Sequence, residues 1–216
     1  AFDLPGHGLS IDAPTDFPDV VAAVRAGIDA VGDPVALLGY SQGARIALAT
    51  ALADQSGLEA LVLISGTPGI EDVDRRRDRA AADARLADRI VASGLDPFLE
   101  EWTATGITAT THRPDDVRDL DRSRRRANTA AGLAAAVTGY GQGAQPSYWQ
   151  DLGRLDIPTL LVVGSDDARY REIAQRMATA ILGAQVAVIE GAGHDPLGDR
   201  PEAVGGVVST FLDGLG

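Results

Sequence analysis

The feature that most constrains the fold is the pentapeptide Gly39-Tyr40-Ser41-Gln42-Gly43, which lies between two different kinds of sequence. The apolar run at 35–38 before it predicts a buried strand, and the alanine-rich run at 44–49 after it predicts a helix. Strand, G-x-S-x-G, helix is the context in which this pattern forms a nucleophile elbow. Both flanking glycines are expected to permit a sharp turn that a Cβ atom would obstruct. We predict that Ser41 is a functional serine; the alternative is an ordinary strand-to-helix turn.

A serine hydroxyl becomes reactive when a histidine takes its proton and an acid orients that histidine. Behind such an elbow the partners follow in the order serine, acid, histidine. The chain has three histidines. His7 precedes the serine and His112 lies in a polar stretch with no strand before it, so we interpret both as surface or loop residues. His194 follows the apolar run 186–189 in a glycine-rich loop, which favours it as the catalytic histidine over a structural role.

The acid is expected at the end of the strand predicted at 159–163. That strand runs into Gly164-Ser165-Asp166-Asp167, and two adjacent aspartates leave the choice between Asp166 and Asp167 open at this point.

Composition limits the classes of protein that the chain can represent. At 216 residues and 45% hydrophobic content it can bury the core of one domain, with or without an insertion. It has no cysteine, which excludes a disulfide framework and a thiol nucleophile and fits a cytoplasmic location. A formal charge of −12 disfavours nucleic acids and anionic membranes as partners, and no stretch is long and apolar enough to predict a membrane span. We expect a small-molecule substrate and no metal or other cofactor.

The order of predicted elements indicates an α/β fold. Residues 1–66 contain a helix at 19–31 and strands around the elbow and at 61–64. Residues 67–150 are rich in alanine, arginine and aspartate, largely helical in pattern and without a convincing strand. From 151 the alternation resumes, with strands at 159–163 and 185–189 and helices at 169–182 and 201–212. We predict a mostly parallel, doubly wound sheet made of 1–66 and 151–216, with a helical lid at 67–150.

All 19 basic residues are arginines, and the predicted lid holds 12 of them against 13 acidic residues. An arginine-weighted lid beside a reactive serine predicts an anionic, polycarboxylate substrate, because guanidinium pairs bidentately with carboxylate. The alternative, favoured for most of these arginines, is a solvated helix face with ion pairs one turn apart. Arg45 stands apart because it follows Ser41 by one helical turn.

With these motifs placed, the chain resembles the menaquinone-pathway 2-succinyl-6-hydroxy-2,4-cyclohexadiene-1-carboxylate (SHCHC) synthases, which are lyases of the α/β-hydrolase fold. The triad loops are common to many relatives, whereas the lid segments are more selective. The matching segments are Asp3-Leu4-Pro5-Gly6-His7-Gly8-Leu9-Ser10, Gly39 to Arg45, Gly66-Thr67-Pro68-Gly69-Ile70, Arg75 to Arg79, Phe98-Leu99-Glu100-Glu101-Trp102, Arg125 with Asn128 and Gly132-Leu133-Ala134, and Gly141-Gln142-Gly143-Ala144-Gln145-Pro146.

The resemblance implies a role for each matching position. Gly164-x-x-Asp167 is similar to the family's acid position, so the implied triad is Ser41, Asp167 and His194, with Asp166 as a loop or capping residue. The other implied roles are carboxylate binding by Arg45, Arg79 and Arg125, a pocket wall by Trp102, a hydrogen-bond donor beside the serine by Tyr40, and an oxyanion-hole N–H by Gln42.

The chain departs from the family's pattern in two places. Its first residues resemble the loop after a central strand of the α/β-hydrolase fold, and the earlier strands and the His-Gly loop that supplies one oxyanion-hole amide are not in the sequence. We therefore expect a fragment, or a further N-terminal piece. Ala44 stands where many relatives have a second glycine, which a helix tolerates.

The activity that the resemblance implies is elimination of pyruvate, with the triad acting as base. An ordinary serine esterase on the same fold is the first alternative, because one triad serves many reactions. An inactive fragment or a non-catalytic homologue is the second. The sequence leaves the oligomeric state open.

Overall fold

The computed structural model describes residues 1, 3–104, 106–108 and 113–215. These residues form two compact units, which are described separately. The sheet unit comprises Val21–Gly69 and Ser147–Gly216, and the helical unit comprises Ala1–Val20 and Ile70–Pro146. Helix α1 (Phe17–Asp29) contains the first junction. The domain boundaries proposed from the sequence remain a prediction, and His112 lies outside the described residues.

The sheet unit is built on a parallel sheet whose four described strands lie in the order β1-β2-β3-β4. The strands are β1 (Val35–Tyr40), β2 (Leu58–Ile64), β3 (Thr159–Gly164) and β4 (Gln185–Ile189). Every residue of β3 is buried, and in β2 only Glu59 is exposed. Strands covered on both faces read as continuous apolar runs, which is why these segments could be predicted from the sequence.

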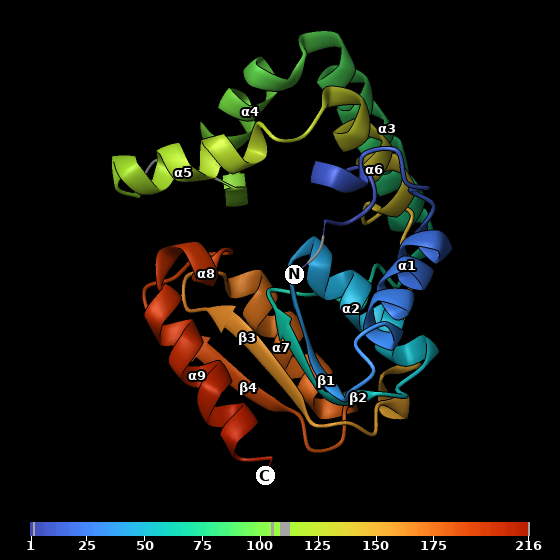
Figure 1. Ribbon diagram of the computed structural model, residues 1–216, viewed down its shortest axis with the longest axis vertical. Helices are drawn as coiled ribbons and strands as arrows, with labels where there is room; N and C mark the ends of the chain where they lie inside the picture. Colours follow the sequence, from blue (N-terminus) through green and yellow to red (C-terminus); the bar gives the residue numbers. More distant parts are fainter. Residues whose placement is uncertain (2, 105, 109–112, 216) are drawn as a thin grey trace. The chain divides into compact units, whose positions relative to one another are not determined.

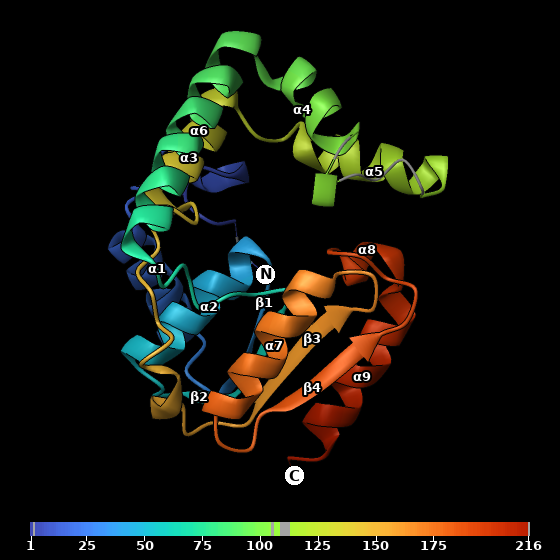
Figure 2. The same ribbon diagram turned by 180° about the vertical axis from the view of Figure 1, so that it is seen from behind.

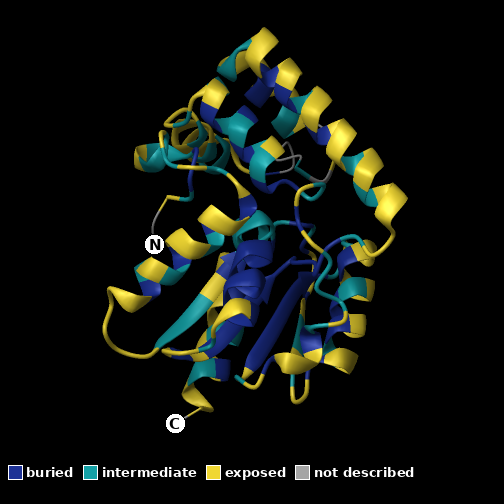
Figure 3. Cartoon of the chain, turned by 90° about the vertical axis from the view of Figure 1, so that its right-hand side faces the viewer, coloured by how far each residue is buried: buried dark blue, intermediate teal, exposed yellow. Residues whose placement is uncertain are grey.

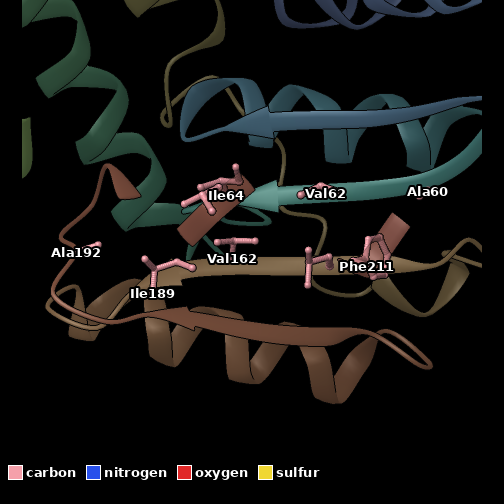
Figure 4. Packing of buried hydrophobic residues seen from close by; sticks show 9 residues of the cluster. Ala60, Val62, Ile64, Val162, Ile189, Ala192 and Phe211 are labelled. Atoms are coloured by element: carbon pink, nitrogen blue, oxygen red, sulfur yellow. The ribbon is translucent and has the colours of Figure 1, made fainter. Parts of the chain in front are cut away.

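Helices cover both faces of this sheet. Helix α2 (Gln42–Ala53) packs on β1 and β2, and α7 (Ala168–Ala180) packs on β3 and β4. Helix α9 (Pro201–Asp213) packs on β3 and β4 from the face opposite α7 (Figures 1 and 2). The α9 face holds a cluster of buried apolar side chains that alternate along the strands (Figure 4): Ala60, Val62, Ile64, Leu160, Val162, Ile189, Ala192, Val204 and Phe211.

Strand β1 differs from β2 and β3 in exposure. It is as apolar as they are, but it forms an edge of the described sheet, and Leu38 is 45% exposed. A strand at an edge presents unpaired backbone groups and loses the cover that a neighbour would give.

The two chain segments that lead into and out of the helical unit are tied together within the sheet unit. The Tyr148 N–H donates to the Pro68 carbonyl at 2.7 Å, and Trp149 Nε1 donates to the Gly69 carbonyl at 3.0 Å. The guanidinium of Arg176 on α7 lies 3.9 Å from the centre of the Trp149 ring, which adds a cation–π contact. These contacts fix both segments against each other.

The helical unit contains α3 (Val73–Ser93), α4 (Leu95–Ala104), α5 (Asp115–Arg125) and α6 (Ala130–Tyr140). Within residues 67–104, 106–108 and 113–150 the structure has no strand, as the sequence predicted. Helix α3 is capped by Asp72, whose side chain accepts from the Arg75 N–H, and it packs mainly on α6. The helices of this unit have long solvent-exposed stretches, whereas the central strands of the sheet unit are buried (Figure 3). The apolar cluster of this unit contains Ala87, Ile90, Phe98, Leu99 and Ala134.

The N-terminal loop packs on α6 in the helical unit. Glycine is needed at Gly6, because a Cβ there would lie 2.7 Å from the Gly132 carbonyl oxygen. The Tyr140 hydroxyl donates to the Pro5 carbonyl at 2.6 Å and lies 3.0 Å from His7 Nδ1. His7 is thus a half-buried loop residue.

Candidate active site

The turn at Ser41 has the geometry of a nucleophile elbow. Ser41 lies between the end of β1 and the start of α2 with φ 48° and ψ −105°, and its N–H donates to the Ile64 carbonyl at 2.8 Å. Non-glycine residues at positive φ are uncommon and cluster at functional sites. A Cβ at Gly39 would lie 2.4 Å from the Gly43 carbonyl oxygen, whereas one at Gly43 would meet nothing within 4 Å outside its own helix. The expected steric need for glycine therefore holds at Gly39 and is wrong for Gly43.

Three side chains of the sheet unit form a chain of hydrogen bonds. Ser41 Oγ lies 3.0 Å from His194 Nε2, and His194 Nδ1 lies 2.7 Å from Asp167 Oδ2. An ionised carboxylate can only accept, so Nδ1 carries the proton and Nε2 is left to accept from the serine hydroxyl. The side chains of His194 and Asp167 are 4% and 8% exposed. In this arrangement the imidazole can accept the proton of the Ser41 hydroxyl, and the serine oxygen can then remove a proton from a substrate.

Asp167 holds both the histidine and the start of a helix. It is the N-cap of α7, where Oδ1 accepts from the Tyr170 N–H at 3.2 Å while Oδ2 faces His194. Asp166 instead accepts from the Ser165 hydroxyl at 3.0 Å through Oδ1. Of the two aspartates left open by the sequence, Asp167 is the one in contact with the imidazole.

The histidine loop, residues 191–194, crosses the end of β3 at very short range. A Cβ at Gly164 would lie 2.1 Å from the Gly193 oxygen and 2.2 Å from the Ala192 oxygen. Main-chain groups of the loop are held on both sides of this crossing. The Gly191 N–H donates to Ser165 Oγ at 2.8 Å, and the Gly193 N–H donates to Asp199 Oδ2 at 2.9 Å. The loop is therefore fixed mainly through its backbone.

Two tyrosine rings flank His194. Tyr170, which is buried, has its ring centre 4.4 Å from that of the imidazole, and Tyr40 has its ring centre at 6.0 Å. Tyr40 was singled out through the family resemblance. Tyr170 was not identified from the sequence. A signal was present, because Tyr170 follows Asp167 by three residues, and an N-cap side chain accepts from the N–H two or three residues further along the chain.

The start of α2 supplies a candidate oxyanion donor and a buried arginine. Gln42 is the first residue of the helix, and in the described part of the chain its N–H has no hydrogen-bond acceptor. First-turn N–H groups point out of a helix and favour negative charge. Arg45 lies one turn further on and is 6% exposed, with its N–H donating to the Ser41 carbonyl at 3.2 Å.

The other predicted binding residues belong to the helical unit. Arg79 on α3 donates from Nε to Asp83 and from Nη1 to Gln142. Arg125 is the last residue of α5 and is half-buried, and its carbonyl accepts from Asn128 Nδ2 at 2.9 Å. Trp102 on α4 lies with its ring centre 5.5 Å from that of Phe98.

Two other arginines of the helical unit form surface ion pairs one helical turn apart, the arrangement given as the alternative: Arg77 with Asp74 and Arg118 with Asp115. Arg126 forms a surface ion pair with Asp96 of α4. Within the described residues, no cluster of three or more histidine, aspartate or glutamate side chains is arranged to hold a metal ion. No described helix is long and apolar enough to cross a membrane.

The parallel sheet, the elbow and the serine–histidine–aspartate chain define a class, and residues 1–206 match the sequence pattern of the alpha/beta hydrolase family. The chain is 31% identical over 204 residues to the 2-succinyl-6-hydroxy-2,4-cyclohexadiene-1-carboxylate synthase of Klebsiella pneumoniae, covering 94% of this chain and 78% of that one. The chain belongs to the alpha/beta hydrolase family, in the group of these synthases.

Further comparisons give the breadth of the likeness. A Bacillus subtilis protein provisionally named as the same synthase is 35% identical over 182 residues, which are 84% of this chain but 66% of that protein. The structure of MenH from S. aureus matches with a TM-score of 0.93 at 26% identity, over 99% of this chain and 82% of that one. A thermophilic esterase of Thermogutta terrifontis, solved with malate bound, matches with a TM-score of 0.83 at 25% identity, over 99% and 78%.

Proposed function

We propose that the protein containing this chain is a lyase that converts 2-succinyl-5-enolpyruvyl-6-hydroxy-3-cyclohexene-1-carboxylate into SHCHC and pyruvate. The observation that carries the proposal is the Ser41–His194–Asp167 chain of hydrogen bonds in a member of the synthase group. The reaction needs a base and a place for developing negative charge, and it needs neither an acyl-enzyme nor a metal. A cytoplasmic location remains a prediction from the sequence.

In the proposed mechanism Ser41, activated by His194, removes the ring proton α to the succinyl ketone. The C–H electron pair forms a new double bond and the ketone oxygen becomes an enolate oxygen. The electrons then move through the ring double bond and break the carbon–oxygen bond to the enolpyruvyl group, which leaves and is protonated to pyruvate. The Gln42 N–H donates to the enolate oxygen, where a preorganised donor in a site that excludes water stabilises charge well.

The proposed substrate carries several carboxylates, and the proposal gives arginine side chains the role of binding them. Arg45, Arg79 and Arg125 are assigned to these groups because guanidinium presents paired donors that match a carboxylate. Trp102 and Tyr40 complete the assignment as an apolar wall and a hydrogen-bond donor. The three carboxylate contacts together orient the α proton toward the base, so the loss of one contact is expected to act mainly on affinity.

A serine esterase is the second candidate function. It is favoured by the likeness to the Thermogutta terrifontis esterase, and the same three triad side chains serve ester hydrolysis. The two candidates differ in substrate charge. An esterase for neutral substrates has no use for three arginines, so neutral short-chain esters separate the two reactions.

The deciding experiment measures pyruvate release by the complete protein from the enolpyruvyl substrate, beside a panel of short-chain p-nitrophenyl esters. Pyruvate release with negligible ester cleavage supports the lyase. Ester turnover without pyruvate identifies a hydrolase, and absence of both activities supports a non-catalytic protein.

The matched variant is Ser41→Ala, which removes the hydroxyl and keeps the fold. We expect pyruvate release to fall by at least about 10³-fold, since the groups of a triad act as a unit. Unchanged release by this variant refutes the mechanism.

A further inference from the structure

The buried face of α3 changes character along the helix. Its C-terminal half presents Leu86, Ala87 and Ile90 to the apolar cluster of the helical unit. One to two turns earlier the same face presents Arg79 and Asp83. Asp83 is 4% exposed, and a buried carboxylate is costly unless its oxygens are paired. The mechanism proposed above gives this carboxylate no role.

Both oxygens of Asp83 accept hydrogen bonds from groups of the helical unit. Oδ1 accepts from Arg79 Nε at 2.7 Å, and Oδ2 accepts from the Gly143 N–H at 3.0 Å. An asparagine amide in the same place has one acceptor oxygen, and its NH₂ would face one of the two donors. The site therefore requires a carboxylate.

The second support for Arg79 comes from the loop after α6. Gln142 Oε1 accepts from Arg79 Nη1 at 2.9 Å, so two different acceptors hold two edges of the same guanidinium. The loop lies directly on α3, since a Cβ at Gly143 would lie 2.3 Å from the Ala80 Cα. A Cβ at Gly141 would lie 2.8 Å from Asp83 Oδ2. The Gly-Gln-Gly sequence thus lets the backbone approach the helix closely enough to bond Asp83.

We propose that Asp83 and Gln142 are positioning residues that hold Arg79 in the orientation in which it binds a substrate carboxylate. A planar guanidinium fixed at Nε and Nη1 has one remaining edge, at Nη2, and within the described residues Nη2 donates no hydrogen bond. A guanidinium that is already held in one orientation loses less conformational entropy when a carboxylate binds to that edge. The inference rests on the proposed function, because it takes the ligand of Arg79 to be a carboxylate of that substrate.

The test compares Asp83→Asn and Gln142→Ala with wild type in the complete protein, by the kinetics of pyruvate release. Because the triad is unchanged, we expect KM to rise about tenfold or more in Asp83→Asn, with kcat within about twofold. Gln142→Ala removes a half-buried side chain and keeps the buried carboxylate, so it tests the same idea with little risk to folding. Asp74→Asn is the matched control, because Asp74 is an exposed carboxylate of α3 paired with Arg77.

A double-mutant cycle separates positioning from a purely structural role. If Asp83 acts through Arg79, then Asp83→Asn raises KM no further in an Arg79→Ala background. Additive effects of the two substitutions on KM overturn the proposal, as does an Arg79→Ala variant with wild-type KM.

A measurement without substrate keeps this inference distinct from the proposed function. The Nε–H proton of a held arginine gives a sharp, slowly exchanging NMR signal. We expect this signal for Arg79 in wild type and Asp74→Asn and its loss in Asp83→Asn. An unchanged signal overturns the positioning even where pyruvate is released. Absence of pyruvate release by the wild type refutes the function and leaves the signal as the test of the geometry.

Discussion

The sheet unit and the helical unit hold their polar groups in different ways. In the sheet unit, Ser41 and His194 are placed by main-chain geometry: a strained elbow and a loop tied through its own N–H groups. In the helical unit, Arg79 projects from a helix and is placed by side chains, Asp83 and Gln142. Strand ends offer rigid backbone positions, whereas a long side chain on a helix needs partners to lose its freedom. Placement by the main chain suits reacting groups, which tolerate little displacement. Placement by side-chain partners suits the recognition of a charged group.

The largest effect is expected from Asp167→Asn. Asparagine cannot stabilise the imidazolium, and it favours the wrong tautomer of His194, so we expect kcat for pyruvate release to fall by about 10⁴-fold with little change in KM. Steady-state kinetics with circular dichroism as the control for folding checks this. A predominant effect on KM would contradict the proposal that Asp167 serves the chemistry and not substrate binding.

The next largest effect is expected from Gly164→Ala, which tests the main chain as the positioning device. The added methyl group must displace the histidine loop, because it would otherwise lie 2.1 Å from the Gly193 oxygen. A displacement of about 1 Å at a reacting group costs about 10²-fold in rate, and we expect a loss of that order in kcat.

Gly205→Ala on α9 makes the same chemical change at a position where a Cβ meets nothing within 4 Å. It should leave kcat unchanged and stabilise the helix by up to about 1 kcal/mol. Equal effects of the two alanines would show that the crossing of the histidine loop over β3 does not position His194.

A smaller effect, on affinity, is expected from Gly143→Ala in the helical unit. Its methyl group would lie 2.3 Å from the Ala80 Cα and must push the 141–145 loop away from α3. The Gln142 side chain and the Gly143 N–H, which donates to Asp83, move with the loop. We therefore expect KM to rise about tenfold while kcat stays near wild type. A fall in kcat at constant KM would show that this loop serves the chemistry and not recognition.

The smallest effect is expected from Arg77→Ala, which removes a surface pair with side chains that are 74% and 83% exposed. Exposed pairs contribute about 0–1 kcal/mol, so the free energy of unfolding should change by less than about 1 kcal/mol and KM should not change. Urea denaturation and the kinetics of pyruvate release measure both. A raised KM would give Arg77 the substrate-binding role that is proposed for Arg79.

The strands could be predicted because each is a short apolar run that ends at a glycine or a polar loop. The structure gives β3 and β4 at or within one residue of the predicted limits, while β2 begins three residues earlier and α1 ends two residues earlier than predicted. Residues at element ends are exposed and mixed in character, so periodicity locates them poorly. The fold class was confirmed by the family match and by the solved structures.

Some residues of the candidate site could be predicted from the sequence and others could not. Ser41 and His194 could be paired because one lies in a G-x-S-x-G turn and the other in a glycine-rich loop after a strand. Choosing Asp167 over Asp166 needed a family resemblance, since adjacent residues share their local sequence. Tyr170, Asp83 and Gln142 were given no role, because a tyrosine, an aspartate and a glutamine on helices or loops are ordinary until their neighbours are known.

The sequence by itself determined the parallel sheet, the elbow at Ser41 and the order of the triad residues, because these depend on short-range patterns of apolar residues and glycines. The tertiary structure decided which aspartate faces His194, which glycines are sterically required and which arginine is held by a buried carboxylate. Those outcomes depend on distances of 2–3 Å between residues as far apart as Arg79 and Gln142. Local preference acts over a few residues, and only packing brings such distant groups into hydrogen-bond range.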